Sequence, residues 1–270
     1  MFYTYPQGKH MALTFSYDDG QVFDRRLVEL FNKYGMKGTF HLNSGRLDRE
    51  GHHGAFVEAA ELATLYAGHE VACHGVFHQD PLLLSEQELL LEYANDRSAL
   101  EECTGGFVQG LSYAYGRFND VTKRVARTVG LKYSRTVNST HDFRVPADFL
   151  EWDPTCHHGD ARLMELGKNL LDSPPHRMMP LMYVWGHSYE FDRDGTWGIM
   201  EAFCELMQGR EDVWYATNLE ICNYVNAIRS LEISMDQKRV YNPSAIPVWV
   251  RNDAGEVIVL EAGKVTIVKA

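Results

Sequence analysis

The sequence is poor in cysteine and lacks any pairing pattern for it. Its five cysteines among 270 residues are odd in number and scattered, and no Cys-x-x-Cys occurs. Disulfide frameworks and cysteine-based zinc sites need paired or closely spaced cysteines. We therefore expect reduced thiols in a reducing compartment.

Positive charge is also in short supply. The chain has 26 lysines and arginines against 37 aspartates and glutamates, which gives a formal net charge of −11. Nucleic acids and anionic membranes require a basic surface, so neither is expected as a main partner. A neutral or cationic substrate fits this charge better.

Long apolar runs are missing. No stretch approaches the roughly 20 apolar residues of a membrane-spanning helix, and residues 1–6 lack the basic start and apolar core of a secretory signal. The sequence as given predicts a cytoplasmic protein.

Strand and helix patterns alternate along most of the chain. Strands are expected at 13–17, 38–43, 69–74, 107–115, 132–137, 149–152, 181–185 and 213–216, and helices at 21–34, 56–66, 85–103, 120–129, 160–171, 197–207 and 219–228. Such alternation is typical of parallel strands with helical crossovers. Residues 1–231 are therefore predicted to form a closed or nearly closed α/β barrel.

The pattern changes after residue 231. Short β-type runs at 248–250, 257–260 and 265–268 are separated by turns, which predicts a small antiparallel meander over residues 232–270. A segment this short cannot bury a core of its own. We expect it to pack on the barrel or on a partner subunit, where it would make a homo-oligomer contact.

Polar residues follow several of the predicted strands. Asp18 and Asp19 end the first strand, before a glycine that permits a turn, and His74 and His78 follow the third. His187 ends a late strand. The carboxyl ends of parallel strands share one face, and one carboxylate with two imidazoles is the open ligand set of a catalytic zinc-type site. If the chain after His74 makes one helical turn, both imidazoles face the same side.

These motifs, read in order, resemble those of the polysaccharide deacetylase family, whose NodB homology domain acts on N-acetyl sugars. The resemblance covers roughly residues 8–230 and is carried by the segments Thr14–Gly20, His74–His78, Tyr115–Asn119 and Trp185–His187. It implies a distorted (β/α) barrel of about seven strands. It also implies a divalent ion, usually Zn²⁺, with Co²⁺, Ni²⁺ or Mn²⁺ as substitutes.

The resemblance assigns roles to individual residues. Asp18 is similar to the catalytic base, and Asp19, His74 and His78 are similar to the metal ligands. His187 resembles the general acid. The backbone amide of Tyr115 resembles the second oxyanion donor.

One position departs from the family pattern. Ser112 stands where the family has an arginine that orients the catalytic aspartate. Arg117 and Arg135 are the two candidates to replace it, and each is also a plausible surface charge.

Further residues are predicted to bind substrate. Tyr17 would shape the pocket floor, and Glu190 would either orient His187 or contact substrate. Side chains that would line the pocket are Trp152, Asp153, His157 and Trp185.

The sequence thus predicts a metal-dependent hydrolase that removes the acetyl group from an N-acetylated carbohydrate. Two alternatives remain open. One is a metal-dependent amidohydrolase acting on a linear or cyclic amide outside carbohydrate chemistry. The other, motivated by Ser112, is a non-catalytic sugar-binding protein on a degenerate scaffold.

Overall fold

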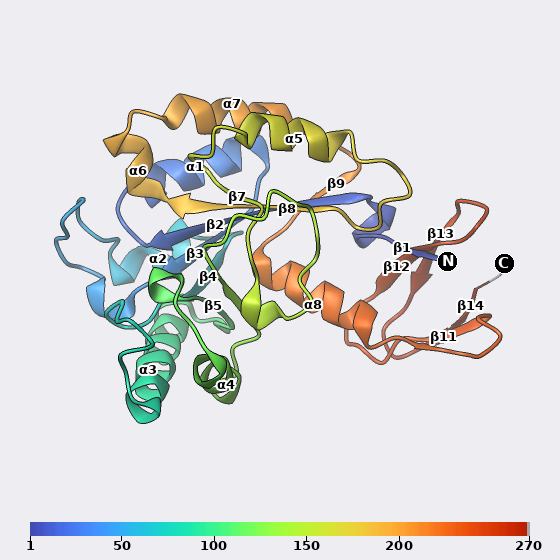
Figure 1. The fold of residues 1–270 in the computed structure, drawn as a ribbon, viewed down its shortest axis with the longest axis horizontal. Helices are drawn as coiled ribbons and strands as arrows, with labels where there is room; N and C mark the ends of the chain where they lie inside the picture. The colour runs from blue at the N-terminus through green and yellow to red at the C-terminus, as the bar shows by residue number, and fades with distance from the viewer. Residues whose placement is uncertain (269–270) are drawn as a thin grey trace.

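The computed structural model describes residues 1–268 and places a curled parallel sheet at its centre (Figure 1). Along the sheet, the strand order is β6 (Tyr133–Arg135), β5 (Gly110–Ser112), β4 (Glu70–Cys73), β3 (Gly38–Leu42), β2 (Met11–Asp19), β8 (Leu181–His187) and β7 (Cys156–His157). β9 (Val213–Tyr215) pairs with the first residues of β2. Among the described residues, seven strands thus follow one another in parallel, which confirms the distorted (β/α) barrel.

Strand β2 is the centre of this sheet. β8 pairs along most of it, and its other edge is shared by β9 and β3. Its residues from Met11 to Asp18 are all buried, as their apolar and β-branched character requires of a strand covered on both faces. Asp18 and Asp19 therefore lie at the end of a strand that is paired on both edges.

The segment after β6 connects the two edges of the curled sheet. The amide of Trp152 donates to Ser134 O at 3.1 Å, and the amide of Thr136 donates to Trp152 O at 3.0 Å. Only Trp152 forms the bridge, because the predicted strand at 149–152 is mostly a 3₁₀ turn at Phe149–Glu151. The strand itself comes later, as β7.

Helices cover the outside of the barrel (Figure 1). They are α1 (Asp24–Tyr34), α2 (Leu62–Leu65), α3 (Glu86–Thr104), α4 (Asp120–Thr128), α5 (Leu163–Leu171), α6 (Ser188–Arg193), α7 (Trp197–Met207) and α8 (Asn218–Arg229). The capping box predicted at the start of α3 is present, with Glu88 Oε2 accepting from the Ser85 amide at 2.8 Å. The predicted helix at 56–66 is much shorter than expected. No helix within residues 1–268 has the length and apolarity needed to cross a bilayer.

The C-terminal strands form two small antiparallel sheets. One contains β1 (Phe2–Tyr3), β12 (Val248–Arg251) and β13 (Val257–Leu260), and the other contains β10 (Glu232–Ile233), β11 (Arg239–Tyr241) and β14 (Val265–Ile267). The prediction of one continuous meander is wrong in its last strand. Buried Asn242 pairs with the turn at 263–264 through both its backbone amide and its carbonyl, which directs β14 to β11.

These sheets pack against α8 and the amino-terminal ends of the barrel strands, away from the ends that carry Asp18 and Asp19 (Figure 1). Tyr224 links α8 to the sheet that contains β1 and β12. Its hydroxyl donates to Thr4 O at 2.7 Å and accepts from the Trp249 amide at 3.0 Å. The predicted appendage ends at residue 270, two residues beyond the described part. Its boundary at 231/232 and its contact with another copy stay predictions.

Candidate metal and catalytic site

The backbone turns at the end of β2, and both adjacent carboxylates reach His74: its Nε2 lies 3.8 Å from Asp18 Oδ2 and 3.9 Å from Asp19 Oδ1. Asp19 already has a positive φ of 79°, and Gly20 follows at 73°. Asp18 is 3% exposed and points into the barrel, whereas Asp19 is only partly buried. In register with Asp18 lie His41 of β3 and His187 of β8, which places all three on one face of the sheet.

His74 and His78 are brought together by a loop. The chain after His74 does not make a helical turn, because Gly75 and His78 have φ values of 82° and 57°. The loop is tied down from outside. Asn43 Nδ2 donates to the carbonyls of His74 and Gly75 at 2.9 and 2.8 Å, and Asp96 Oδ2 accepts from the amides of the same two residues at 3.0 and 2.9 Å.

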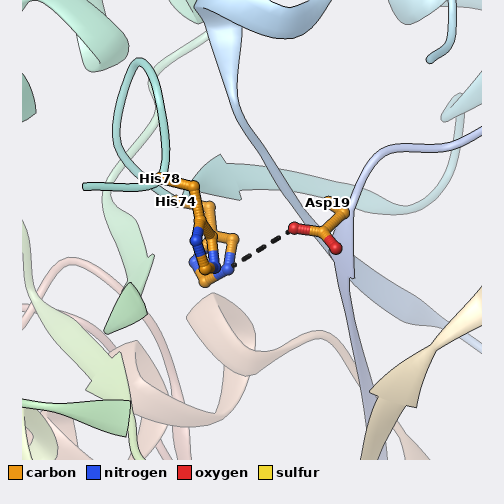
Figure 2. Close-up of side chains that lie close together, drawn as sticks. All are labelled: Asp19, His74 and His78. Atoms are coloured by element: carbon orange, nitrogen blue, oxygen red, sulfur yellow. Dashed lines mark ion pairs between the residues drawn. The ribbon is translucent and has the colours of Figure 1, made fainter. Parts of the chain in front are cut away.

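Asp19, His74 and His78 meet in space as the sequence predicted. Each offers one ligand atom, and these atoms lie within 4.8 Å of one another. Figure 2 shows the two imidazoles side by side, facing the carboxylate of Asp19. His74 Nε2 lies 3.9 Å from Asp19 Oδ1. Two ligand atoms of one ion at about 2 Å each are separated by a distance of this order.

The hydrogen bonds of this cluster fit a cation. His74 Nδ1 donates to Ser112 O at 2.9 Å, so Nε2 carries the lone pair. Within the described chain, neither this Nε2 nor Asp19 Oδ1 has a hydrogen-bond partner, although both atoms are buried. Unpaired buried acceptors are costly, and an ion bound between them would satisfy both. The donor set therefore fits Zn²⁺ or a similar divalent ion.

Arg135 and Ser112 hold the two oxygens of Asp18. Arg135 Nη2 donates to Oδ2, and the Ser112 hydroxyl donates to Oδ1 at 3.1 Å. The guanidinium is 1% exposed, bonds Ser16 Oγ at 3.1 Å through Nε and lies 4.3 Å from the centre of the Trp185 ring. Burial alone would raise the pKa of Asp18, but Arg135 and nearby histidines outweigh it and hold the pKa well below its usual range.

The structure decides between the two candidate arginines. Arg117 pairs with Asp80 and its side chain is half exposed. The family arginine was expected on β5, at the position of Ser112. Arg135 enters the site from β6, the strand next to β5. The position that Ser112 leaves open is therefore filled from the neighbouring strand.

His187 ends β8 on the same face as Asp18. Its Nδ1 lies 3.4 Å from Glu190 Oε2, within α6. Burial alone would lower the pKa of His187, but Glu190, Asp18 and Asp19 outweigh it, so the pKa is raised. This contact supports a role for Glu190 in orienting His187, and its contact with substrate stays a prediction.

Tyr115 lies beside the metal cluster. It has a φ of 59° in the 3₁₀ turn Ala114–Gly116, and its ring packs edge-on against His78 with centroids 4.5 Å apart. Its side chain is largely exposed. A groove of about 610 Å³ opens there, lined by His78, Gln79, Asp80, Leu83, Leu84, Tyr115 and Arg117.

Two predicted substrate residues are in the core. Tyr17 is fully buried and stacks on His158 with centroids 5.7 Å apart, and Trp152 is 1% exposed among Tyr133, Phe149 and Tyr183. Neither ring is accessible to a substrate, so these two predictions are wrong. The physical reason is that Trp152 is the residue that bridges the edges of the barrel.

The other predicted substrate residues have defined neighbours. Trp185 is half-buried between Arg135 and His157, with ring centroids 4.8 Å apart for the latter pair. His157 Nε2 lies 3.0 Å from Glu190 Oε2. Asp153 accepts hydrogen bonds from Thr136 and Asn138. Their contact with substrate stays a prediction.

Sequence reasoning missed Asp96, which fixes the loop of the metal cluster. A signal was present. On α3 the buried positions include Leu89, Tyr93, Asp96 and Leu100, so a carboxylate occupies an apolar stripe. A charged residue on such a stripe needs hydrogen-bond partners, which here are backbone amides. His41 was also missed, and burial lowers its pKa to about 3.

The fold and this cluster define a NodB-type barrel. Residues 4–134 match the family model described as polysaccharide deacetylase. The resemblance seen in the motifs is confirmed: this part of the chain is similar to the polysaccharide deacetylase family.

One curated relative is the peptidoglycan deacetylase of Helicobacter pylori, which is 26% identical over 121 residues. The match covers 44% of this chain and only 38% of that protein.

Solved structures share the fold. A Mycobacterium smegmatis structure assigned as a polysaccharide deacetylase has a TM-score of 0.60 at 18% identity, covering 85% of this chain and 95% of that one. A family 4 acetyl xylan esterase from Clostridium thermocellum, in complex with a cobalt ion, has a TM-score of 0.53 at 14% identity, covering 78% and 89%. At these identities the likeness concerns the fold alone.

Proposed function

We propose that this chain is a divalent-metal-dependent hydrolase that removes the acetyl group from an N-acetylated carbohydrate. The observation that carries the proposal is the pair of buried acceptors, His74 Nε2 and Asp19 Oδ1, which face each other with no partner among residues 1–268. The family match and the cobalt ion named for the Clostridium thermocellum esterase support a metal at this cluster.

Asp19, His74 and His78 would hold the ion, and their donor set suits Zn²⁺. When bound, such an ion lowers the pKa of a coordinated water to about 7 and polarises the acyl oxygen. Asp18 is the proposed base that takes the proton of the attacking water. Arg135 and Ser112 keep its carboxylate ionised and fixed, so it is ready to accept that proton at neutral pH.

His187 is the proposed general acid. It gives a proton to the departing amine, because an amine anion is too poor a leaving group for the C–N bond to break. Its raised pKa, supported by Glu190, favours the protonated form that this step needs. The backbone amide of Tyr115 would donate to the oxyanion, a contact worth roughly 3 to 4 kcal/mol in other hydrolases.

The family match and the groove beside the cluster support a carbohydrate substrate. A largely exposed tyrosine beside the metal cluster offers a flat apolar face of the kind on which sugar rings pack. The acidic net charge of −11 favours a neutral or cationic glycan.

The test combines metal analysis with acetate release from a panel of N-acetyl sugars. We expect a single bound ion, loss of acetate release after chelation, and recovery with Zn²⁺, Co²⁺, Ni²⁺ or Mn²⁺. Asp19→Asn should lose both the ion and the activity, whereas Asp172→Asn, an exposed carboxylate, should keep both. Ammonia or another acid in place of acetate would support a non-carbohydrate amidohydrolase. Sugar binding without turnover would support the non-catalytic alternative.

A further inference from the structure

A second group of ligand-type side chains lies next to the catalytic cluster. One oxygen of Glu190, Oε2, faces three imidazole nitrogens: His157 Nε2 at 3.0 Å, His158 Nε2 at 3.4 Å and His187 Nδ1 at 3.4 Å. His157, His187 and Glu190 alone bring three ligand atoms within 4.8 Å of one another, which would suit a second ion.

A hydrogen bond to His157 Nδ1, the ring nitrogen that does not face Glu190, argues against an ion here. The amide of Gly159 donates to His157 Nδ1 at 3.1 Å, so Nδ1 is an acceptor. In a neutral imidazole the other nitrogen, Nε2, must then carry the proton. A protonated Nε2 cannot bind a metal, but it can donate to Glu190 Oε2.

His158 has the same tautomer for a different reason. Its ring is enclosed by Phe191 and Tyr17, with centroids 4.1 and 5.7 Å away, and burial lowers its pKa to about 3. Its Nδ1 lies against Gly186, where an added Cβ would be only 2.0 Å away, and no polar atom among residues 1–268 pairs with this nitrogen. Nε2, which lies 3.4 Å from Glu190 Oε2, therefore carries the proton.

We propose that His157 is a positioning residue: with its tautomer fixed by Gly159, it clamps the Glu190 carboxylate in the place from which Glu190 orients His187. The inference rests on the proposed function of His187 as general acid. It replaces the predicted substrate contact of His157 with an indirect role through Glu190.

The clamp explains why Glu190 does not turn away from His187. Arg193 Nη2 lies 3.6 Å from the other oxygen, Oε1, at the exposed edge of the group. The amide of His187 also donates to Oε2, at 3.3 Å, and His158 Nε2 lies 3.4 Å away. Without the N–H of His157, only these two longer contacts oppose a turn of the carboxylate toward the arginine. Burial alone would raise the pKa of Glu190, but His157 and His187 outweigh it and hold the pKa far below its usual range.

The first test needs no activity. Long-range ¹H–¹⁵N spectra of the metal-loaded protein should show His157 and His158 as neutral rings protonated at Nε2. A proton on His157 Nδ1 would overturn the inference. So would a second bound ion that is lost in His157→Gln.

The second test separates positioning from substrate binding. His157→Leu should lower kcat by about 10- to 100-fold with KM changed less than about threefold, as expected for a weakened general acid. His157→Gln, whose amide N–H can replace Nε2–H, should stay within about fivefold of the wild-type kcat. The control is His176→Leu, an exposed histidine expected to change neither constant. A raised KM with unchanged kcat in both His157 variants would show substrate contact and overturn the inference.

These tests also separate the inference from the function it depends on. If the wild-type protein releases no acetate, the proposed function fails while the tautomer spectra still test the clamp. If acetate is released but His157 carries its proton on Nδ1, only the clamp fails.

Discussion

Ser112 and Arg135 lie directly opposite each other on the parallel strands β5 and β6, and each holds a different oxygen of Asp18. The serine also touches the metal cluster, because its Oγ lies 2.7 Å from His74 Nδ1. The proposed base and one proposed metal ligand are thus joined through a single hydroxyl. This arrangement supports testable expectations about both residues.

Arg135→Gln should impair both activity and stability. Removing the guanidinium leaves Asp18 as a buried charge with a weaker partner, which typically costs about 3 kcal/mol or more of unfolding free energy. We expect kcat to fall about 100-fold, within the range known for loss of acid–base function. Acetate-release kinetics and urea unfolding measure the two effects.

The matched control is Arg124→Gln, which removes an exposed arginine that pairs with Glu86 away from the site. Its kcat should stay within about threefold of wild type, since a surface pair contributes at most about 1 kcal/mol. A further variant exchanges the pair, Ser112→Arg with Arg135→Ser. If it is no more active than Arg135→Ser alone, the two positions are not equivalent sources of the guanidinium.

Ser112→Ala should weaken metal binding more than it weakens the fold. His74 Nδ1 keeps its bond to the Ser112 carbonyl but loses the hydroxyl, and Asp18 loses its donor on Oδ1. Loss of such outer contacts typically lowers metal affinity about 10- to 100-fold. Competition with a chelator measures this change, and unaltered affinity would contradict the bridging role.

Asp96→Asn should disorder the loop that carries both histidines. Its oxygens accept from the amides of Ser44, His74 and Gly75, and an asparagine NH₂ group cannot accept from any of them. Each buried amide left without a partner costs about 1 to 3 kcal/mol. We expect lower unfolding free energy together with weaker metal binding.

Asn95→Ala is the control for Asp96, because this neighbour on α3 is exposed. Denaturant unfolding and metal titration of both variants separate the loop effect from helix propensity. Equal stability of the two variants would show that the buried carboxylate does not hold the loop.

Glu70 should make stability depend on pH. Burial raises its pKa from 4.5 to about 7, despite hydrogen bonds from Tyr133, Thr39 and the Leu219 amide. The folded state therefore binds this proton more tightly than the unfolded state does. The resulting stability is present below pH 4.5 and is lost as pH rises toward 7, by up to about 3 kcal/mol.

Glu70→Gln replaces the titrating carboxyl group with an amide that does not titrate. Unfolding free energies of wild type and variant at pH 5 and pH 7.5 give the contribution of Glu70 as a double difference, because other buried acids such as Asp24 are common to both. The wild type should lose more stability than the variant over this interval. A loss of equal size in both would show that Glu70 does not titrate there.

Local sequence predicted the residues that the strands deliver to the site. Asp18, Asp19, His74, His78 and His187 all follow strands that the apolar pattern makes visible. Parallel strands with helical crossovers bring their carboxyl ends to one face, so position in the sequence was enough to predict a common site. The capping box of α3 was equally visible, because its contacts span three residues.

Contacts between distant segments could not be predicted in this way. Arg135 reaches Asp18 only because β6 lies beside β5 in a register that sets it opposite Ser112. The burial of Trp152 depends on its bridge to β6, and the pairing of β14 with β11 depends on the hydrogen bonds of Asn242. Each of these contacts depends on which strands lie next to each other in the folded sheet.

The sequence by itself determined the family resemblance, the barrel and the three ligand-type side chains, because those features depend on periodicity and on motifs within a few residues. Tertiary structure decided what surrounds them: which arginine faces the base, which carboxylate holds the histidine loop and which rings are closed to substrate. The physical reason is that a buried charge or ring takes its partners from whatever the folded chain packs against it, and that packing is fixed only when the sheet curls and its edges meet.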